Sequence, residues 1–144
     1  MLKMYLFAAD RAWTYESRAC PELARGSLVL WDRYVDSALA YRAAELRLGR
    51  STIDMDLVIR INEPFVRPTA VILIDISTAV SHQRGLLNSL PEPYDLELLE
   101  QVRREYSALA TQFGYDVVDG ERAAEAVASD IAGIIRKRCP EAFV

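Results

Sequence analysis

The sequence predicts an α/β domain in which a parallel sheet is flanked by helices. Three short apolar runs have the composition of strands buried on both faces, and amphipathic helical segments separate them along the 144 residues. Strands that alternate with helices are typical of a parallel sheet, because each crossover has room for a helix. Residues 1–144 are expected to form a single domain, since no linker, repeat or low-complexity segment divides them.

Each element follows from the spacing of its apolar residues and from the residues at its ends. Pro21 is expected to interrupt the first helix and Gly26 is well placed to end it, while Ser37 is suited to cap the second. The first half is expected to contain a helix from Met4 toward Cys20, a strand at 28–31, a helix from Asp36 or Ser37 to Leu48 and a helix from Thr52 to Asn62. The second half is expected to contain a strand at 70–75, a helix from Ser77 to Arg84, a loop at 85–93, a helix from Asp95 to Phe113, a strand and turn at 115–120 and a helix from Ala123 to Arg138.

The last of these helices has an apolar stripe that predicts a buried face. Its members recur every three or four positions, as one side of a helix requires. They are Ala124, Val127, Ala128, Ile131, Ile134 and Ile135.

Composition excludes several classes of function. Seventeen basic and twenty-one acidic residues give a net charge of −4, so neither nucleic acid nor a membrane surface is an expected partner. The apolar stretch 70–74, like every other in the sequence, is far shorter than the roughly 20 residues that a membrane span needs. Two cysteines are too few for a disulfide framework, and a cytoplasmic location is the simplest expectation. The single histidine, His82, excludes a multi-histidine metal site.

Two strand candidates end in an acidic residue, Asp32 after 28–31 and Asp75 after 70–74. Ligands of an open parallel sheet bind beyond the carboxyl ends of its strands. Arg33 follows Asp32 directly, and its planar guanidinium suits a phosphate. An aspartate after a strand is equally often only a turn or helix-cap residue, so both interpretations stay open at this point.

The residues around this arginine resemble the central block of thymidylate kinases. Residues 7–11 read F-A-A-D-R, residues 21–26 read P-E-L-A-R-G, and residues 29–41 read V-L-W-D-R-Y-V-D-S-A-L-A-Y. In that family a similar helix precedes the pattern D-R-Y-x-x-S-x-x-A-Y. The likeness continues in order through 62–75, 79–84, 94–109 and 118–120. It therefore implies the P-loop fold of nucleoside monophosphate kinases, with a lid at about 84–94.

The sequence lacks the phosphate-binding loop with which that family begins, because it contains no G-x-x-x-x-G-K-[ST] pattern. The resemblance thus implies the C-terminal two-thirds of such a domain, missing the first strand, P-loop and helix. The missing strand would lie between the strands at 28–31 and 70–75. Those two strands are expected either to leave a gap or to hydrogen-bond directly to one another, and we expect the gap.

The resemblance implies a substrate-binding role for five residues. Phe7 would stack on the nucleobase, and Arg11 would hydrogen-bond the edge of the base. Arg33 would bind the monophosphate, while Ser37 and Tyr41 would line the nucleoside. Without the resemblance, an aromatic residue on a helix such as Phe7 or Tyr41 is equally a packing residue.

The resemblance implies catalytic roles for Asp32, Arg33 and Arg84. Asp32 would lie near Mg²⁺ and the accepting phosphate without being a direct metal ligand. Arg84 would begin the lid that closes over the phosphates. Four further arginines, Arg103, Arg104, Arg136 and Arg138, are expected to be solvated.

The activity implied by the resemblance is transfer of the γ-phosphate of ATP to dTMP, giving dTDP, with ATP and Mg²⁺ as cofactors of the complete enzyme. A homodimer is also implied, with the helix from Met4 to Cys20 in its interface. The present chain is expected to be inactive alone, since it lacks the phosphate-binding loop. Alternatives are a non-catalytic nucleotide-binding pseudokinase, a structural partner of another chain, or a preference for another pyrimidine monophosphate.

Overall fold

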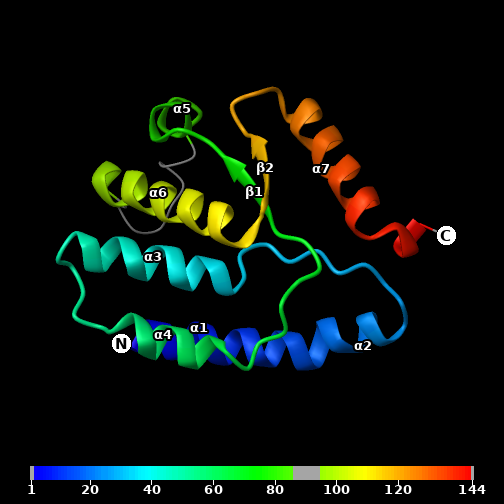
Figure 1. Cartoon of the computed structure of the whole chain (residues 1–144), viewed down its shortest axis with the longest axis horizontal. Coiled ribbons are helices and arrows are strands. Elements are labelled where there is room, and N and C mark those ends of the chain that lie inside the picture. The colour runs from blue at the N-terminus through cyan, green and yellow to red at the C-terminus, as the bar shows by residue number, and fades with distance from the viewer. Residues whose placement is uncertain (1, 86–94, 144) are drawn as a thin grey trace.

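The fold is a small parallel sheet among helices, as the sequence predicts, and the computed structural model describes residues 2–85 and 95–143 (Figure 1). The first half contains α1 (Leu2–Thr14), a π-helical segment (Tyr15–Ala19), α2 (Cys20–Ala24), α3 (Val35–Arg47) and α4 (Met55–Asn62). The second half contains β1 (Ile72–Asp75), α5 (Thr78–Gln83), α6 (Leu96–Phe113), β2 (Asp116–Asp119), α7 (Ala124–Arg138) and a 3₁₀ turn (Pro140–Phe143). Most of the expected lid, residues 86–94, lies outside the described residues.

In the described part of the chain the sheet has two parallel strands, β1 and β2, which pair from Ile72 with Asp116 to Asp75 with Asp119. Just beyond the strand ends, the backbone N–H of Gly120 donates to the carbonyl of Asp75 at 2.8 Å. A Cβ at position 120 would come within 2.9 Å of that same carbonyl oxygen, so only glycine fits this approach without a shift. Both strands thus end in an aspartate at one edge of the sheet.

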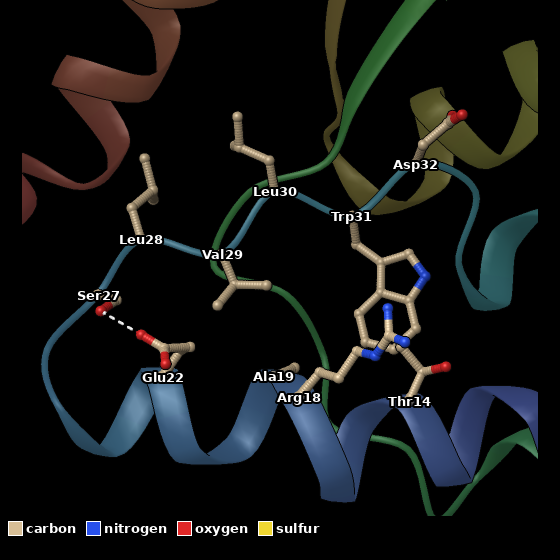
Figure 2. A pocket seen from close by; sticks show the side chains of 10 residues that line it. All are labelled: Thr14, Arg18, Ala19, Glu22, Ser27, Leu28, Val29, Leu30, Trp31 and Asp32. Carbon is tan, nitrogen blue, oxygen red and sulfur yellow. Dashed lines mark hydrogen bonds between the residues drawn. The ribbon is translucent and has the colours of Figure 1, made fainter.

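The expected strand at 28–31 is wrong as a sheet element. These residues pair with neither described strand, and no backbone hydrogen bond joins them to residues 71–74. Direct pairing, one of the two expected outcomes, is therefore not found among these described residues. The apolar run still alternates as a strand would, with Val29 and Trp31 facing the preceding helices and Leu28 and Leu30 facing away (Figure 2). Residues 28–31 have the composition of a strand, but a strand also needs a neighbouring strand to complete its backbone hydrogen bonds.

The first helix does not stop at Pro21, contrary to expectation. It continues through the π-helical segment Tyr15–Ala19 into α2, and it ends at Gly26, as expected, where φ is +81°. Proline lacks an N–H and its ring presses on the carbonyl four residues earlier. The wider π turn just before Pro21 relaxes this clash, so the chain stays helical.

Two helices differ from the expectation, α3 in the residue that caps it and α7 in how far it is buried. α3 begins at Val35, before Ser37, and its N-cap residue Tyr34 makes no side-chain cap hydrogen bond, so Ser37 is not the cap. α7 has the predicted bounds but none of its residues is fully buried, because among the described residues it packs mainly on two small elements, β2 and the 3₁₀ turn Pro140–Phe143. The predicted buried stripe of α7 is therefore only half covered.

The core lies between helices rather than beneath the sheet. Its fully buried cluster is formed by Met4, Val35, Leu39 and Val58 from α1, α3 and α4. α3 also packs along α6, which carries the sheet on its other side (Figure 1). Among the described residues, no helix is both long and apolar enough to cross a bilayer.

Candidate functional site

Arg33 has an unusual backbone conformation at the start of α3. Its φ is +58°, in the left-handed region that residues other than glycine seldom adopt. Such a conformation costs on the order of 1–3 kcal/mol and is concentrated at functional sites. The exposed guanidinium lies 5.8 Å from the centre of the Tyr41 ring, two turns into α3. The structure thus brings together two of the residues that the resemblance assigned to the nucleotide.

Ser37 joins this group through a partner on α6. Its hydroxyl lies 2.7 Å from that of Tyr106, and either oxygen can donate. Burial raises the pKa of Tyr106, while the hydrogen bond with Ser37 opposes that shift, so the phenol stays neutral near pH 7. Ser37 was expected as a helix cap or a nucleoside contact, and the structure places its hydroxyl between α3 and α6.

Arg11 is buried, with only 8% of its surface exposed. It donates to Oδ1 of Asn62 at 2.6 Å, and its guanidinium carbon lies 5.7 Å from the ring centre of Tyr34 and 5.1 Å from that of Phe65. Burial lowers the pKa of Arg11, while nearby Tyr34, Asp10 and Asp36 oppose the change. Since Tyr34 follows Arg33 directly, the surroundings of Arg11 adjoin the Arg33 group.

A buried carboxylate, Asp36, completes this part of the molecule. It accepts a hydrogen bond from the hydroxyl of Tyr115, and Arg67 lies 3.8 Å away. Burial raises the pKa of Tyr115, and the contact with Asp36 raises it further. These contacts link the first turn of α3 to the residue just before β2.

Asp75, the acid expected at the end of a strand, forms an ion pair with Arg103. Arg103 donates to both of its carboxylate oxygens, from Nε and from a terminal nitrogen, at 2.7 Å each. The prediction that Arg103 is simply a solvated residue is therefore wrong. Arg138 also pairs with an aspartate, Asp116, at 2.8 and 3.0 Å, but it stays exposed as expected. Arg103 lies one turn before Tyr106, so α6 connects the strand end to Ser37.

Arg84 lies elsewhere, at the end of α5. Its guanidinium donates to the backbone carbonyls of Gly120 at 2.7 Å, Glu121 at 2.5 Å and Arg122 at 3.3 Å. These three bonds tie α5 to the loop after β2, seen at the top of Figure 1. The expected role of Arg84 in the lid stays a prediction.

Phe7 and Asp32 are exposed, and Phe7 has 64% of its surface accessible on α1. Asp32 borders a hollow of about 470 Å³ between the first helices and residues 27–32, and its carboxylate points away from those helices (Figure 2). A hydrogen bond from Ser27 to Glu22 closes one end of this hollow. Among the residues assigned to the substrate or to catalysis, Asp32 alone lines it.

The described residues do not by themselves fit a complex of Mg²⁺ and ATP. Both oxygens of Asp75 are engaged by Arg103, which leaves Asp32 as a single carboxylate beside Arg33. In residues 2–85 and 95–143, no group of three or more His, Cys, Asp or Glu side chains is arranged to hold a metal ion.

Several residues of this region escaped the sequence interpretation. The sequence by itself predicts no site role for Tyr106 or for Asn62, the first residue of the family-like segment 62–75. Both act through partners far along the chain, and Asn62 contacts a residue 51 positions away. An available signal was the polar side chain at the end of an apolar helix, a position that needs a hydrogen-bond partner once buried.

Comparison with known proteins identifies the family. The family model described as thymidylate kinase matches residues 2–131. A probable thymidylate kinase of Pyrobaculum aerophilum is 32% identical over 133 residues, and that of Pyrobaculum calidifontis is 34% identical over 133 residues; each match covers 92% of this chain and 66% of the relative. A thymidylate kinase of Geobacter sulfurreducens is 34% identical over 152 residues, covering 96% of this chain and 69% of the relative.

The chain thus spans just under two thirds of the length of the two Pyrobaculum relatives. The matches run through every residue that the resemblance assigned, from Phe7 to Arg84. Together with the parallel α/β fold, they give the conclusion that this chain belongs to the thymidylate kinase family.

Proposed function

We propose that the region around Arg33 binds a pyrimidine nucleoside monophosphate, dTMP, as the phosphate acceptor of a thymidylate kinase. The observation that carries the proposal is the left-handed Arg33 at the start of α3, followed by Ser37 and Tyr41 on the next two turns. Membership of the family and the relatives named as thymidylate kinases support it.

Electrostatics favours a phosphate at this end of α3. The first N–H groups of a helix carry partial positive charge, and Tyr34 offers those of α3 no side-chain acceptor, although the N–H of Ser37 donates to the Tyr34 carbonyl at 3.3 Å. A monophosphate accepts hydrogen bonds from such groups and from a guanidinium beside them. Arg33 is exposed, so it can reach a ligand without breaking a buried contact.

Base recognition is assigned to α1. Phe7 and Arg11 are four residues apart, which places them on neighbouring turns of one side of the helix. An exposed aromatic ring offers a stacking surface, and a guanidinium offers donors to carbonyl oxygens of a base. Both residues are therefore proposed to contact the base, with the nucleoside between them and Tyr41.

The reaction of the whole protein is proposed to transfer the γ-phosphate of ATP to a phosphate oxygen of dTMP, giving ADP and dTDP. Such transfer depends on positioning and on neutralising charge rather than on covalent catalysis. Arg33 is proposed to bind the phosphate of dTMP. Arg84 is proposed to act at the start of the lid that closes over the phosphates. ATP and Mg²⁺ supply the donor and charge neutralisation when bound.

A second candidate is a pseudokinase or structural partner that binds a nucleotide without phosphoryl transfer. The observation that favours it concerns the groups that would hold Mg²⁺ and the phosphates of ATP. Asp75 is engaged by Arg103, and the sequence has no G-x-x-x-x-G-K-[ST] pattern. In either case the acceptor site is proposed to be the same.

A homodimer is the proposed assembly. Leu2, Leu6 and Trp13 lie on one face of α1 and expose 59–72% of their surface. An apolar stripe of this kind is typical of a helix that packs against another helix.

The proposal is tested by calorimetric titration of the purified chain with dTMP. We expect Arg33→Ala to weaken binding by about 1.5–3 kcal/mol, the scale of a hydrogen bond to a charged group, or about 10- to 150-fold. Arg33→Gly removes the same guanidinium but suits a φ of +58°, so it should lose affinity while remaining folded.

The matched control is Arg104→Ala. The Arg104 side chain is 68% exposed and its nearest carboxylate, on Glu100, is 3.8 Å away. This control should bind dTMP as the unsubstituted chain does. If both Arg33 variants bind dTMP as tightly as the unsubstituted chain does, Arg33 is not part of the site and the proposal is contradicted.

A further inference from the structure

Asn62, the last residue of α4, is buried and has both halves of its amide engaged. Only 5% of its surface is exposed. Its Nδ2 donates to the carbonyl of Val58 at 2.7 Å, one turn earlier in the same helix. Its Oδ1 accepts from Arg11 at 2.6 Å. The bond within α4 fixes the amide orientation, so the oxygen is presented to Arg11.

The guanidinium of Arg11 has few other constraints from polar groups. It lies against the rings of Tyr34 and Phe65, which themselves meet edge to face with centres 6.3 Å apart. Aromatic faces attract a cation but do not choose its rotation in the ring plane. A guanidinium has five N–H donors in a rigid fork, so one directional hydrogen bond sets where the others point.

We infer that Asn62 is a positioning residue for Arg11 and thereby helps to select the base of the bound nucleotide. This inference rests on the proposed function, because it takes Arg11 as the residue that meets the base edge. Asn62 holds one side of the guanidinium, and the remaining donors are aimed toward the base. Asn62 itself does not contact the ligand.

The expected selectivity follows from donor and acceptor chemistry. Arginine can only donate, so it favours a base whose edge presents a carbonyl oxygen. Thymine has the O4 acceptor at the position where cytosine has an amino donor. A guanidinium held in one orientation therefore discriminates between dTMP and dCMP, whereas a freely rotating one can turn away from the mismatched amino group.

The experiment compares variants of the full chain by calorimetry with dTMP and dCMP. Asn62→Leu keeps the branching at Cγ in a larger side chain and removes both hydrogen bonds. Asn62→Ser is a second variant with a side chain too short to reach Arg11, used where the leucine variant does not fold. Val58→Ala is the matched control, because Val58 is buried in the same helix and its substitution loosens packing while leaving the Asn62–Arg11 bond in place.

We expect the Asn62 variants to lower the preference for dTMP over dCMP by about five- to tenfold, the scale of one hydrogen bond. Val58→Ala should lower the melting temperature and leave the preference unchanged. A readout without nucleotide comes from nitrogen NMR of the Arg11 guanidinium. Rotation about its terminal C–N bonds should be slow in the unsubstituted chain and faster in the Asn62 variants.

Two results would overturn the inference. One is an Asn62 variant that keeps both the preference and the slow rotation while Arg11→Ala loses dTMP binding. The other is Val58→Ala lowering the preference as much as the Asn62 variants do, which would make the effect one of general loosening. If neither Arg11→Ala nor Arg33→Ala changes dTMP binding, the proposed function fails instead, and the rotation measurement alone decides whether Asn62 positions Arg11.

Discussion

At the scale of single residues, the ion pair between Asp75 and Arg103 joins the end of β1 to α6. The two bonds from Arg103 lower the pKa of Asp75, and partial burial opposes that shift. A carboxylate whose pKa is lower in the folded than in the unfolded chain stabilises the fold above its unfolded pKa, about 3.9. This contribution is lost as the pH falls through the folded pKa.

We therefore predict that Asp75→Asn destabilises the protein at pH 7 and that this difference shrinks as the pH falls below about 3.9. Both side chains are about one-third exposed, so solvent screening limits the effect to about 1 kcal/mol. Urea unfolding at a series of pH values measures it. Glu141→Gln, at an exposed position near the C-terminus, is the control and should show no such trend. A difference that stays constant from pH 7 to pH 3 would contradict the assignment.

The position of a site residue could be predicted where neighbouring residues in the sequence determine it. It could not be predicted where it depends on a contact with a residue far along the chain. Arg33 follows an apolar run and precedes a helix, so its position near the start of α3 could be read from neighbouring residues alone. The contacts of Ser37 with Tyr106 and of Arg11 with Asn62 span 69 and 51 residues. No local spacing encodes such pairs, because they depend on how the helices pack.

At the scale of elements, helices were predicted closely because their ends carry their own signals. Asp95 caps α6 by accepting from the N–H of Leu98, and Gly114 ends that helix with a φ of +68°. Strand status depends instead on a neighbour, which explains why residues 72–75 form β1 while the equally apolar residues 28–31 remain unpaired. For the same reason α7 was predicted with correct bounds and incorrect burial.

The exposed stripe of α1 leads to a prediction about assembly. Leu2, Leu6 and Trp13 are spaced by four and seven residues, which keeps them on one helical face. We expect light scattering of the purified chain to give twice the mass of one chain, and Leu6→Lys to give a monomer at the same concentration. Leu96→Lys, at an exposed apolar position on α6, should remain dimeric. A monomeric unsubstituted chain would contradict this interface.

At the scale of the whole molecule, the family and the α/β class followed from the sequence, whereas the arrangement of the layers did not. The expected three strands were reduced to two paired strands within the described residues, and the core formed between α1, α3 and α4. Long-range packing decides which apolar faces are covered, and apolar spacing alone specifies only that a face exists. The proposed acceptor region lies where α3 meets α6, a junction that only the folded chain reveals.

Residues proposed to bind the phosphate acceptor are present in this chain, whereas a loop that would hold the phosphates of the donor is not found in its sequence. We therefore predict that the 144-residue chain alone does not phosphorylate dTMP. Donor phosphates need backbone N–H groups and a lysine to hold them, and the sequence has no G-x-x-x-x-G-K-[ST] pattern. Release of ADP in a coupled assay with ATP, Mg²⁺ and dTMP should stay at the level without protein, while a full-length relative turns over in the same buffer. Turnover by the purified chain that disappears in Arg33→Ala would contradict this prediction, because the donor would then be held by other residues.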